Sequence, residues 1–178
     1  MPDLGFEFAP IGLAITRHRQ IEECNALFSE MFGFARFELI GQSLAILYPS
    51  QDEFQRIGTR GTKAMLDGGR YDDERIMQRK DGSLFWCRVR GQSLTLNDPL
   101  AHSVWSWADL SENRPLIRLS QRERQVAMLL TEGKTSKEIA RDLEISPRTV
   151  ETHRANMMSK LNARNSTDLV ARLSGVPV

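Results

Sequence analysis

The chain has 178 residues, 40% of them hydrophobic and 26% charged, and a formal net charge of +1 at pH 7. This composition excludes a disordered chain, and the length suffices for two small domains. The sequence contains no apolar run of the roughly 18 residues that a membrane span needs, and it begins without a basic and apolar leader, so it predicts a cytoplasmic protein with no membrane partner.

The two cysteines, Cys24 and Cys87, are expected to be reduced thiols in that compartment. They lack nearby histidines at metal-ligand spacing, so no metal site is predicted. We expect both to be small core residues rather than redox sensors.

The front part of the chain has the patterns of both strands and helices. Strands are predicted at residues 13–16 and 21–24, then a helix over residues 25–34 that ends at Gly33, then a longer helix over residues 52–69. Three further strands are predicted at residues 71–80, 83–96 and 102–110, separated by turns at Lys80-Asp81-Gly82 and Asn97-Asp98-Pro99. These elements predict an α+β domain with an antiparallel sheet.

From Leu119 onward the sequence predicts helices only, and several helix starts are marked by capping residues. In a capping box a hydroxyl and a carboxylate satisfy backbone N–H groups that a helix start leaves free. The signals are Ser120 with Glu123, Thr135 with Glu138, and the N-cap Ser146 followed by Pro147. A fourth helix is predicted to begin at Ser166 or Thr167. Only Glu144 and Ile145 precede the Ser146 cap, which is the tight connection of a helix-turn-helix.

The charge is distributed unevenly between the two parts. Residues from Pro115 onward include 11 Lys and Arg against 7 Asp and Glu, whereas the residues before it include 13 against 16. Only the tail is therefore attractive to a polyanion such as DNA. We place the domains at residues 1–112 and 119–178, with residues 113–118 as the linker.

The tail resembles the LuxR-type helix-turn-helix over residues 119–173, and ISPRTVETHRANMMSKLNA is most similar to its FixJ branch. The matching residues include Arg122, Glu123, Gly133, Lys137, Glu138, Ile139, Ala140, Leu143, Ser146, Thr149, Val150, His153, Lys160 and Leu161. The resemblance implies a small all-α domain of four helices that binds double-stranded DNA as a homodimer, with RNA polymerase as a further candidate partner. A two-fold dimer requires an inverted-repeat operator.

The resemblance also assigns roles to individual residues. Lys137, Ser146, Thr149, His153 and Lys160 would lie at or near the DNA backbone, and Glu151, Thr152 and Ala155 would face bases. Arg148 lies on the same outward face as Glu151, Thr152 and Ala155, and Arg154 and Lys160 lie at its flanks, where basic side chains hold phosphates. Glu151 and Ala155 share one side of the helix, where a carboxylate accepts from cytosine N4 and a methyl group contacts thymine. The pairing of two copies would use Leu169, Arg172 and Leu173.

Two alternatives stay open in the tail. Taken as an isolated helix, residues 148–159 have the pattern of the solvated side of an amphipathic helix, and only the resemblance favours DNA. His153 either contacts phosphate or packs against the preceding helix.

The front part resembles a PAS domain in the order of its elements and in six short motifs. These are APIGLAI, the run Asn25-Ala26-Leu27-Phe28, Gly33-Phe34, ELIGQS, RKDGSLFW and ADLSENR. The resemblance implies a sensor domain whose sheet curves around a pocket for a small molecule. Flavin adduct chemistry is not expected, because Leu44 stands where light-sensing members have cysteine. Haem is not expected either, because the long helix contains no histidine and only His18 and His102 remain in this part.

Trp105 and Trp107 lie on the same face of the last predicted strand. They either stack on an aromatic ligand or clamp a partner at an interface, or else they fill the pocket or cover the sheet, and we favour the filling or covering role. Asp109 and Ser111 resemble the closing motif that couples PAS domains to their outputs, so we expect Asp109 to tie the strand to the linker.

The sequence thus predicts a one-component transcriptional regulator in which a PAS-type sensor controls DNA binding. The alternative is a regulator whose front domain is a ligand-free module for dimerisation or partner docking. An enzyme is not expected, because the sequence contains no nucleophile and base pair, GxSxG motif or P-loop.

Overall fold

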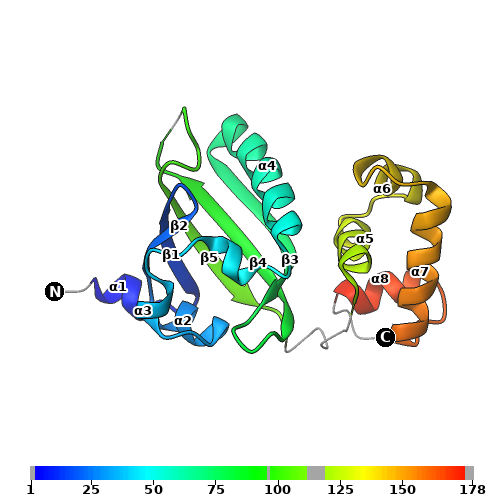
Figure 1. The fold of residues 1–178 in the computed structure, drawn as a ribbon, viewed down its shortest axis with the longest axis horizontal. Coiled ribbons are helices and arrows are strands. Elements are labelled where there is room, and N and C mark those ends of the chain that lie inside the picture. The colour runs from blue at the N-terminus through cyan, green and yellow to red at the C-terminus, as the bar shows by residue number, and fades with distance from the viewer. Residues whose placement is uncertain (1–2, 96, 112–118, 175–178) are drawn as a thin grey trace. The chain divides into compact units, whose positions relative to one another are not determined.

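The computed structural model describes residues 3–95, 97–111 and 119–174, and it divides into two compact units (Figure 1). Unit 1 comprises Met1–Leu110 and unit 2 comprises Ser111–Val178. The predicted linker at residues 113–118 lies outside the described residues. No described helix is long and apolar enough to cross a membrane.

Unit 1 is built on one five-stranded antiparallel sheet with the order β2-β1-β5-β4-β3. The strands are β1 (Gly12–Arg17), β2 (Gln20–Cys24), β3 (Arg70–Gln78), β4 (Leu84–Ser93) and β5 (Ser103–Asp109). All five predicted strands are confirmed. The pairing of β1 with β5 places the first hairpin beside the last strand, which local sequence patterns do not reveal.

The helical elements of unit 1 are α1 (Leu4–Glu7), α2 (Ala26–Phe32), α3 (Arg36–Leu39), the 3-10 turn η1 (Leu44–Leu47) and α4 (Gln51–Gly68). Apart from α1, which has no buried residue, they lie over one face of the sheet (Figure 1). The helix α2 ends as predicted, because Gly33 adopts the left-handed conformation, with φ of 73°, that favours glycine. The helices α1 and α3 were not predicted, since four residues are too few to show a helical period.

The amide of Asn25 connects α2 to the first strand. Its Oδ1 accepts from the backbone N–H of Phe28, at 3.0 Å, and of Leu13, at 2.9 Å. Its Nδ2 donates to the carbonyl of Ile11 at 2.9 Å. One fully buried side chain therefore caps the helix and fixes its position on the sheet.

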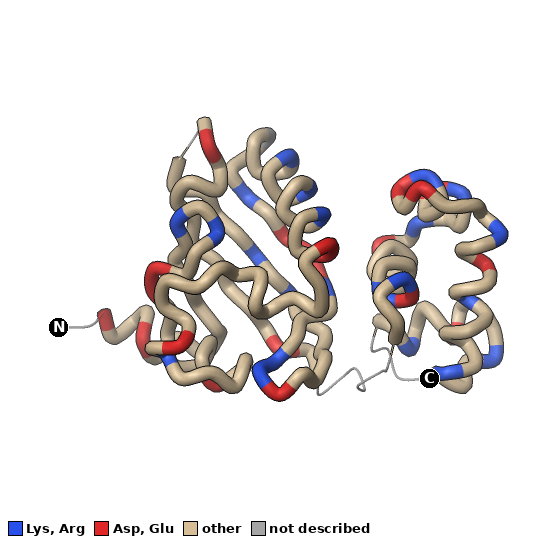
Figure 2. The backbone as a smooth tube through the Cα atoms, viewed as in Figure 1, with Lys and Arg blue, Asp and Glu red and all other residues tan. Residues whose placement is uncertain are grey.

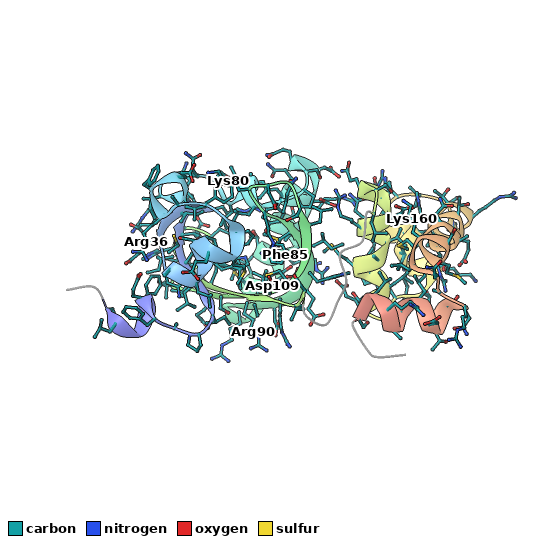
Figure 3. All side chains as sticks on the ribbon, turned by 90° about the horizontal axis from the view of Figure 1, so that it is seen from below. Arg36, Lys80, Phe85, Arg90, Asp109 and Lys160 are labelled. Carbon is teal, nitrogen blue, oxygen red and sulfur yellow. The ribbon has the colours of Figure 1, made fainter. Side chains whose placement is uncertain are left out.

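Two ion pairs connect the short helices to other parts of unit 1. Arg36 of α3 pairs with Glu7 of α1, and Lys80, in the turn after β3, pairs with Glu38 of α3 (Figure 3). Both pairs are partly exposed to solvent, so each is expected to contribute at most about 1 kcal/mol.

The inner face of the sheet is filled by large side chains. Strand alternation places Trp105 and Trp107 there together, with ring centroids 6.2 Å apart. A Cβ at Gly91 would lie 2.4 Å from the Trp105 ring, so a glycine is required at this position of β4. Cys24 and Cys87 are buried free thiols, as predicted, and burial raises the pKa of Cys87.

A charged pair lies among these apolar side chains. Arg75 is 2% exposed, and its Nε donates to Asp73 Oδ1 at 2.8 Å. The hydroxyl of Tyr71 donates to the other carboxylate oxygen, and Arg75 Nη1 donates to the hydroxyl of Tyr48. Each buried charge is thus compensated by an opposite charge and by hydrogen bonds, without which its burial would be prohibitive.

Unit 2 consists of α5 (Gln121–Thr131), α6 (Ser136–Asp142), α7 (Pro147–Leu161) and α8 (Ser166–Ser174). Both predicted capping boxes and the Ser146 N-cap are present, and α8 begins at Ser166. Its core is made by side chains from all four helices, among them Val126, Ile139, Val150, Met157, Leu169 and Leu173. The predicted fold class is confirmed for both units.

We expect Asp73→Ala to lower the free energy of unfolding of unit 1 by about 3–5 kcal/mol, because it leaves the Arg75 charge buried and unpaired. Denaturant unfolding followed by tryptophan fluorescence measures this, since all three tryptophans lie in unit 1. The control is Asp72→Ala, which removes an exposed carboxylate on the outer face, paired with Arg88 and Arg90, and should cost about 1 kcal/mol or less. Equal losses in the two variants would contradict a structural role for the buried pair.

Candidate nucleic-acid interface and interior cavity

The helices α6 and α7 are joined by a short turn that places them as a helix-turn-helix. Glu144 adopts a left-handed conformation, with φ of 54°, and the N–H of Ile145 donates to the carbonyl of Ala140 at 3.0 Å. Ser146 Oγ then accepts from the N–H of Thr149 at 3.0 Å and begins α7. The turn directs α7 across α6, and its fixed caps leave the outer side of α7 free.

The predicted base-facing residues lie on that outer side. Figure 2 shows Lys and Arg positions spread along α6 and α7, with acidic positions among them. The exposed members of the predicted set are Lys137, Ser146, Arg148, Glu151, Thr152, Ala155 and Lys160. Thr149, His153 and Arg154 are half-buried, and both roles of His153 stay open. Seven of the ten predicted residues are therefore accessible to solvent, and their contact with DNA stays a prediction.

Glu151 is held by two neighbours that the sequence did not connect to it. Ser136, the first residue of α6, donates its hydroxyl to Glu151 Oε1, and Arg154 Nη1 donates to the same oxygen at 3.0 Å. Arg154 also contacts the hydroxyl of Ser136 at 2.6 Å. The Glu151 side chain is still 58% exposed. Its carboxylate thus faces outward in a defined orientation, while much of the Arg154 charge is paired within the unit.

Lys160 has a partner inside unit 2. Its Nζ donates to Glu123 Oε2 at 2.6 Å, and the Glu123 side chain is only 4% exposed (Figure 3 labels Lys160). The same carboxylate accepts from the N–H of Ser120 at 2.6 Å. Burial alone would raise the pKa of Glu123, but the hydrogen bonds from Lys160 and Ser120 outweigh burial and lower it. In the structure, Lys160 therefore connects α7 to α5 through this ion pair.

The predicted pairing residues of α8 occupy two different environments. Leu169 and Leu173 are fully buried in the unit, so these side chains belong to its core and are not presented to a second copy. Arg172 Nε donates to Asp168 Oδ1 at 2.9 Å along the same helix. Of the three residues, only the half-buried Arg172 is accessible for a contact between copies.

In unit 1 the structure places both predicted pocket tryptophans in the interior. Trp105 Nε1 donates to Thr16 Oγ1 at 2.9 Å, and the Trp107 ring lies 4.7 Å from that of Phe28. Beside them is a cavity with about 20 Å³ open to water-sized molecules. It is lined by Arg19, Leu44, Tyr48, Ile57, Gly58, Gly61, Tyr71, Arg75, Val89, Leu100, Trp105 and Trp107.

The two arginines in this lining were not predicted. Tyr71, Asp73 and Arg75 alternate along β3, so they share the inner face with Met77. A charged pair on the same strand face as a tyrosine and a methionine is the signal that would have identified Arg75. Arg19 gives no such signal, because it lies in the turn between β1 and β2.

Asp109, at the end of β5, has a partner that the sequence did not indicate. Asp109 Oδ2 accepts from Arg79 Nη2 at 2.6 Å, and the Arg79 guanidinium lies 3.8 Å from the centre of the Phe85 ring (Figure 3). Asp109 thus ties the last strand to the end of β3. Ser111 is the last described residue before the linker, so the predicted tie to the linker stays a prediction.

Two family patterns match the chain. The pattern described as "PAS domain" matches residues 10–112, and the pattern described as "Bacterial regulatory proteins, luxR family" matches residues 118–173.

Individual proteins resemble the two units separately and together. A PAS domain of a LuxR-family transcriptional regulator from Burkholderia thailandensis, solved in complex with ethanol, is 49% identical over 62% of this chain and 98% of its own, with a TM-score of 0.61. FixJ of Rhizobium meliloti is 56% identical over 73 residues, which are 39% of this chain and 36% of FixJ. VqmA of Vibrio cholerae covers 96% of this chain and 85% of its own, with a TM-score of 0.54 at 20% identity, a likeness of fold alone. The chain spans about a fifth to a third of the length of the curated relatives that it matches.

We expect Lys160→Ala to lower the free energy of unfolding of unit 2 by about 1–3 kcal/mol at pH 7, because it leaves the buried Glu123 carboxylate without its cation. Unit 2 contains no Trp or Tyr, so tryptophan fluorescence follows the unfolding of unit 1 alone. A transition seen by far-UV circular dichroism but not by fluorescence therefore measures the unfolding of unit 2. Lys137→Ala, at an exposed position of α6, is the matched control and should be nearly neutral.

The loss in Lys160→Ala should depend on pH. The folded-state pKa of Glu123 is below its unfolded value of about 4.3, so the ion pair stabilises the fold above that pH. The contribution disappears as the pH falls through the folded-state pKa. A difference between wild type and variant that persists at full size below this range would contradict the role given to Glu123.

Proposed function

The chain belongs to the PAS domain family and carries a helix-turn-helix domain of the luxR family of bacterial regulatory proteins, and we propose that it is a transcriptional regulator in which the first controls the second. The observation that carries the proposal is the exposed polar side of α7, with α6 packed behind it as in DNA-reading helix-turn-helix proteins. The 56% identity to FixJ over the same region supports it.

The exposed residues of α7 have the chemistry of a major-groove reader. Glu151 accepts hydrogen bonds, which suits the N4 amino group of cytosine, and the methyl group of Ala155 suits that of thymine. Lys137 and Arg148 supply charge for phosphates on either side. Because Lys160 and Arg154 are already paired within the unit, we assign the larger share of phosphate binding to the first two.

We further propose that the protein acts as a homodimer on an inverted repeat and that it is not an enzyme. We also propose that it is a cytoplasmic protein, because its proposed partners, chromosomal DNA and RNA polymerase, are found there. Because Leu169 and Leu173 are enclosed in unit 2, the contact between copies must use other residues.

For unit 1 we propose the sensing of a small organic molecule, without haem or flavin. The interior cavity beside Trp105 and Trp107 supports this role, and the related PAS domain from Burkholderia thailandensis was solved in complex with ethanol. A second candidate is a ligand-free dimerisation or docking module. One observation favours the second candidate, namely that the side chains leave only about 20 Å³ of the interior open.

We expect the full chain to select an inverted repeat from random duplex DNA. The selection should be repeated at two salt concentrations, because phosphate contacts weaken steeply with salt and base contacts do not. Recovery of salt-sensitive binding without any sequence motif, in the presence and absence of small-molecule mixtures, would contradict the proposed function.

Two variants separate base reading from phosphate binding. Glu151→Gln should shift the preference at one position of each half-site from cytosine towards adenine, a change of about 1–3 kcal/mol in discrimination. Lys137→Ala should weaken binding to all sequences and reduce the salt dependence by about one phosphate contact. Lys63→Ala, an exposed lysine of α4 in unit 1, is the control and should do neither. If Glu151→Gln and Lys137→Ala had the same effect on every duplex, the assigned roles would be wrong.

A further inference from the structure

The half-buried Arg19 lines the cavity from the turn between β1 and β2. Its Nη2 donates to the carbonyl of Phe54 at 2.7 Å, and its Cζ lies 3.3 Å from the centre of the Phe54 ring. A Cβ at Gly58 would lie 2.2 Å from Arg19 Nη1. The helix α4 therefore contains a glycine where the guanidinium needs space, although glycine weakens a helix interior by about 1 kcal/mol.

This guanidinium gives the cavity an excess of positive charge. Arg19 and Arg75 both line the cavity, and Arg75 Nη1 donates to the Tyr48 hydroxyl. Asp73 balances Arg75, whereas Arg19 pairs with no carboxylate among the residues that the structure describes. Partial burial lowers the pKa of Arg19, because the charged form loses part of its hydration.

The rest of the lining limits which anion would fit. Apart from the two guanidiniums and two tyrosines, it consists of glycines and apolar or aromatic side chains, among them Leu44, Ile57 and Trp105. Phosphate or sulfate would leave several of its oxygens without donors in such a cavity, and that is costly. A carboxylate with an apolar tail matches both halves of the lining, because a guanidinium binds it through two parallel N–H bonds.

We propose that this cavity binds a small organic monocarboxylate, with Arg19 as its charged partner and the tryptophan side of the cavity around its apolar part. The proposal rests on the sensor function of unit 1 and names the ligand class. The open volume of about 20 Å³ holds roughly one water molecule. The acid therefore enters by displacing the Arg19 side chain from the Phe54 ring, and Arg19 then pairs with it.

The test is direct binding to the full chain in the absence of DNA. Sodium propionate, butyrate and benzoate are titrated by calorimetry and tryptophan fluorescence, each against its own amide, at constant ionic strength set with sodium chloride. We expect at least one acid to bind at least tenfold more tightly than its amide and to raise the unfolding temperature of unit 1.

Variants of the turn identify the charged partner. Arg19→Gln should weaken binding of that acid at least tenfold. Arg19→Lys keeps the positive charge but cannot donate two parallel N–H bonds, and it should weaken binding less. Arg17→Gln changes an exposed arginine of the same hairpin, paired with Glu22, and should bind like wild type. Far-UV circular dichroism and tryptophan emission check that each variant is folded. The ligand class is overturned if every acid binds no better than its amide, or if Arg19→Gln binds like wild type.

The outcome for the ligand can be separated from the outcome for the proposed function. An acid that binds through Arg19 but leaves the affinity for the selected DNA unchanged supports the ligand class and contradicts the sensor role. DNA binding that responds only to neutral small molecules overturns the ligand class and leaves the regulator intact.

Discussion

The buried guanidinium of Arg75 is the constraint around which unit 1 is organised. A charge that is 2% exposed requires an anion and hydrogen-bond acceptors close by. Asp73 meets this requirement from the same strand, and Tyr48 from the segment before α4. The inner face of the curved sheet is consequently a polar cluster surrounded by aromatic rings, and the space that remains beside it is the cavity that Arg19 enters. The same feature that fixes the packing of the core therefore also gives the cavity its chemistry.

Unit 2 is subject to a different constraint. A domain of four short helices has many backbone groups at helix ends that lack partners within the helix. Each of the first three helices begins with a hydroxyl that accepts from the backbone, and two of them add a carboxylate. Glu123 serves both as a cap of α5 and as the partner of Lys160 in α7. Glu151 is similarly shared between the outer surface and α6, through Ser136. The surface proposed to read DNA is thus held by the contacts that hold the helices together, which gives the reader a fixed orientation before it meets DNA.

The strand β5 connects the two proposed activities along the chain. Its inner face carries Trp105 and Trp107 at the cavity, and it ends at Asp109, which Arg79 ties to the end of β3. A ligand that moved the tryptophan rings would act on the last strand before unit 2 in the sequence. Arg90 lies on the outer face of the same sheet (Figure 3) and does not line the cavity, which is formed by side chains of the inner face. Sensing and the transmission of a signal would therefore share one strand.

The sequence by itself determined the fold class, the five strands, the main helices and the side of α7 that faces outward. It did so because caps, turns and face periodicity depend on residues a few positions apart, and Ser120 with Glu123 or Gly33 after α2 can be recognised without knowing the rest of the fold. Only the tertiary structure decided which charges find partners. The pairing of Lys160 with Glu123, the contact of Ser136 with Glu151, the enclosure of Leu169 and Leu173, and the approach of Arg19 to Gly58 all join distant segments. Whether a side chain is free to meet a ligand is set by what packs against it, and packing between distant segments is not encoded in any local pattern.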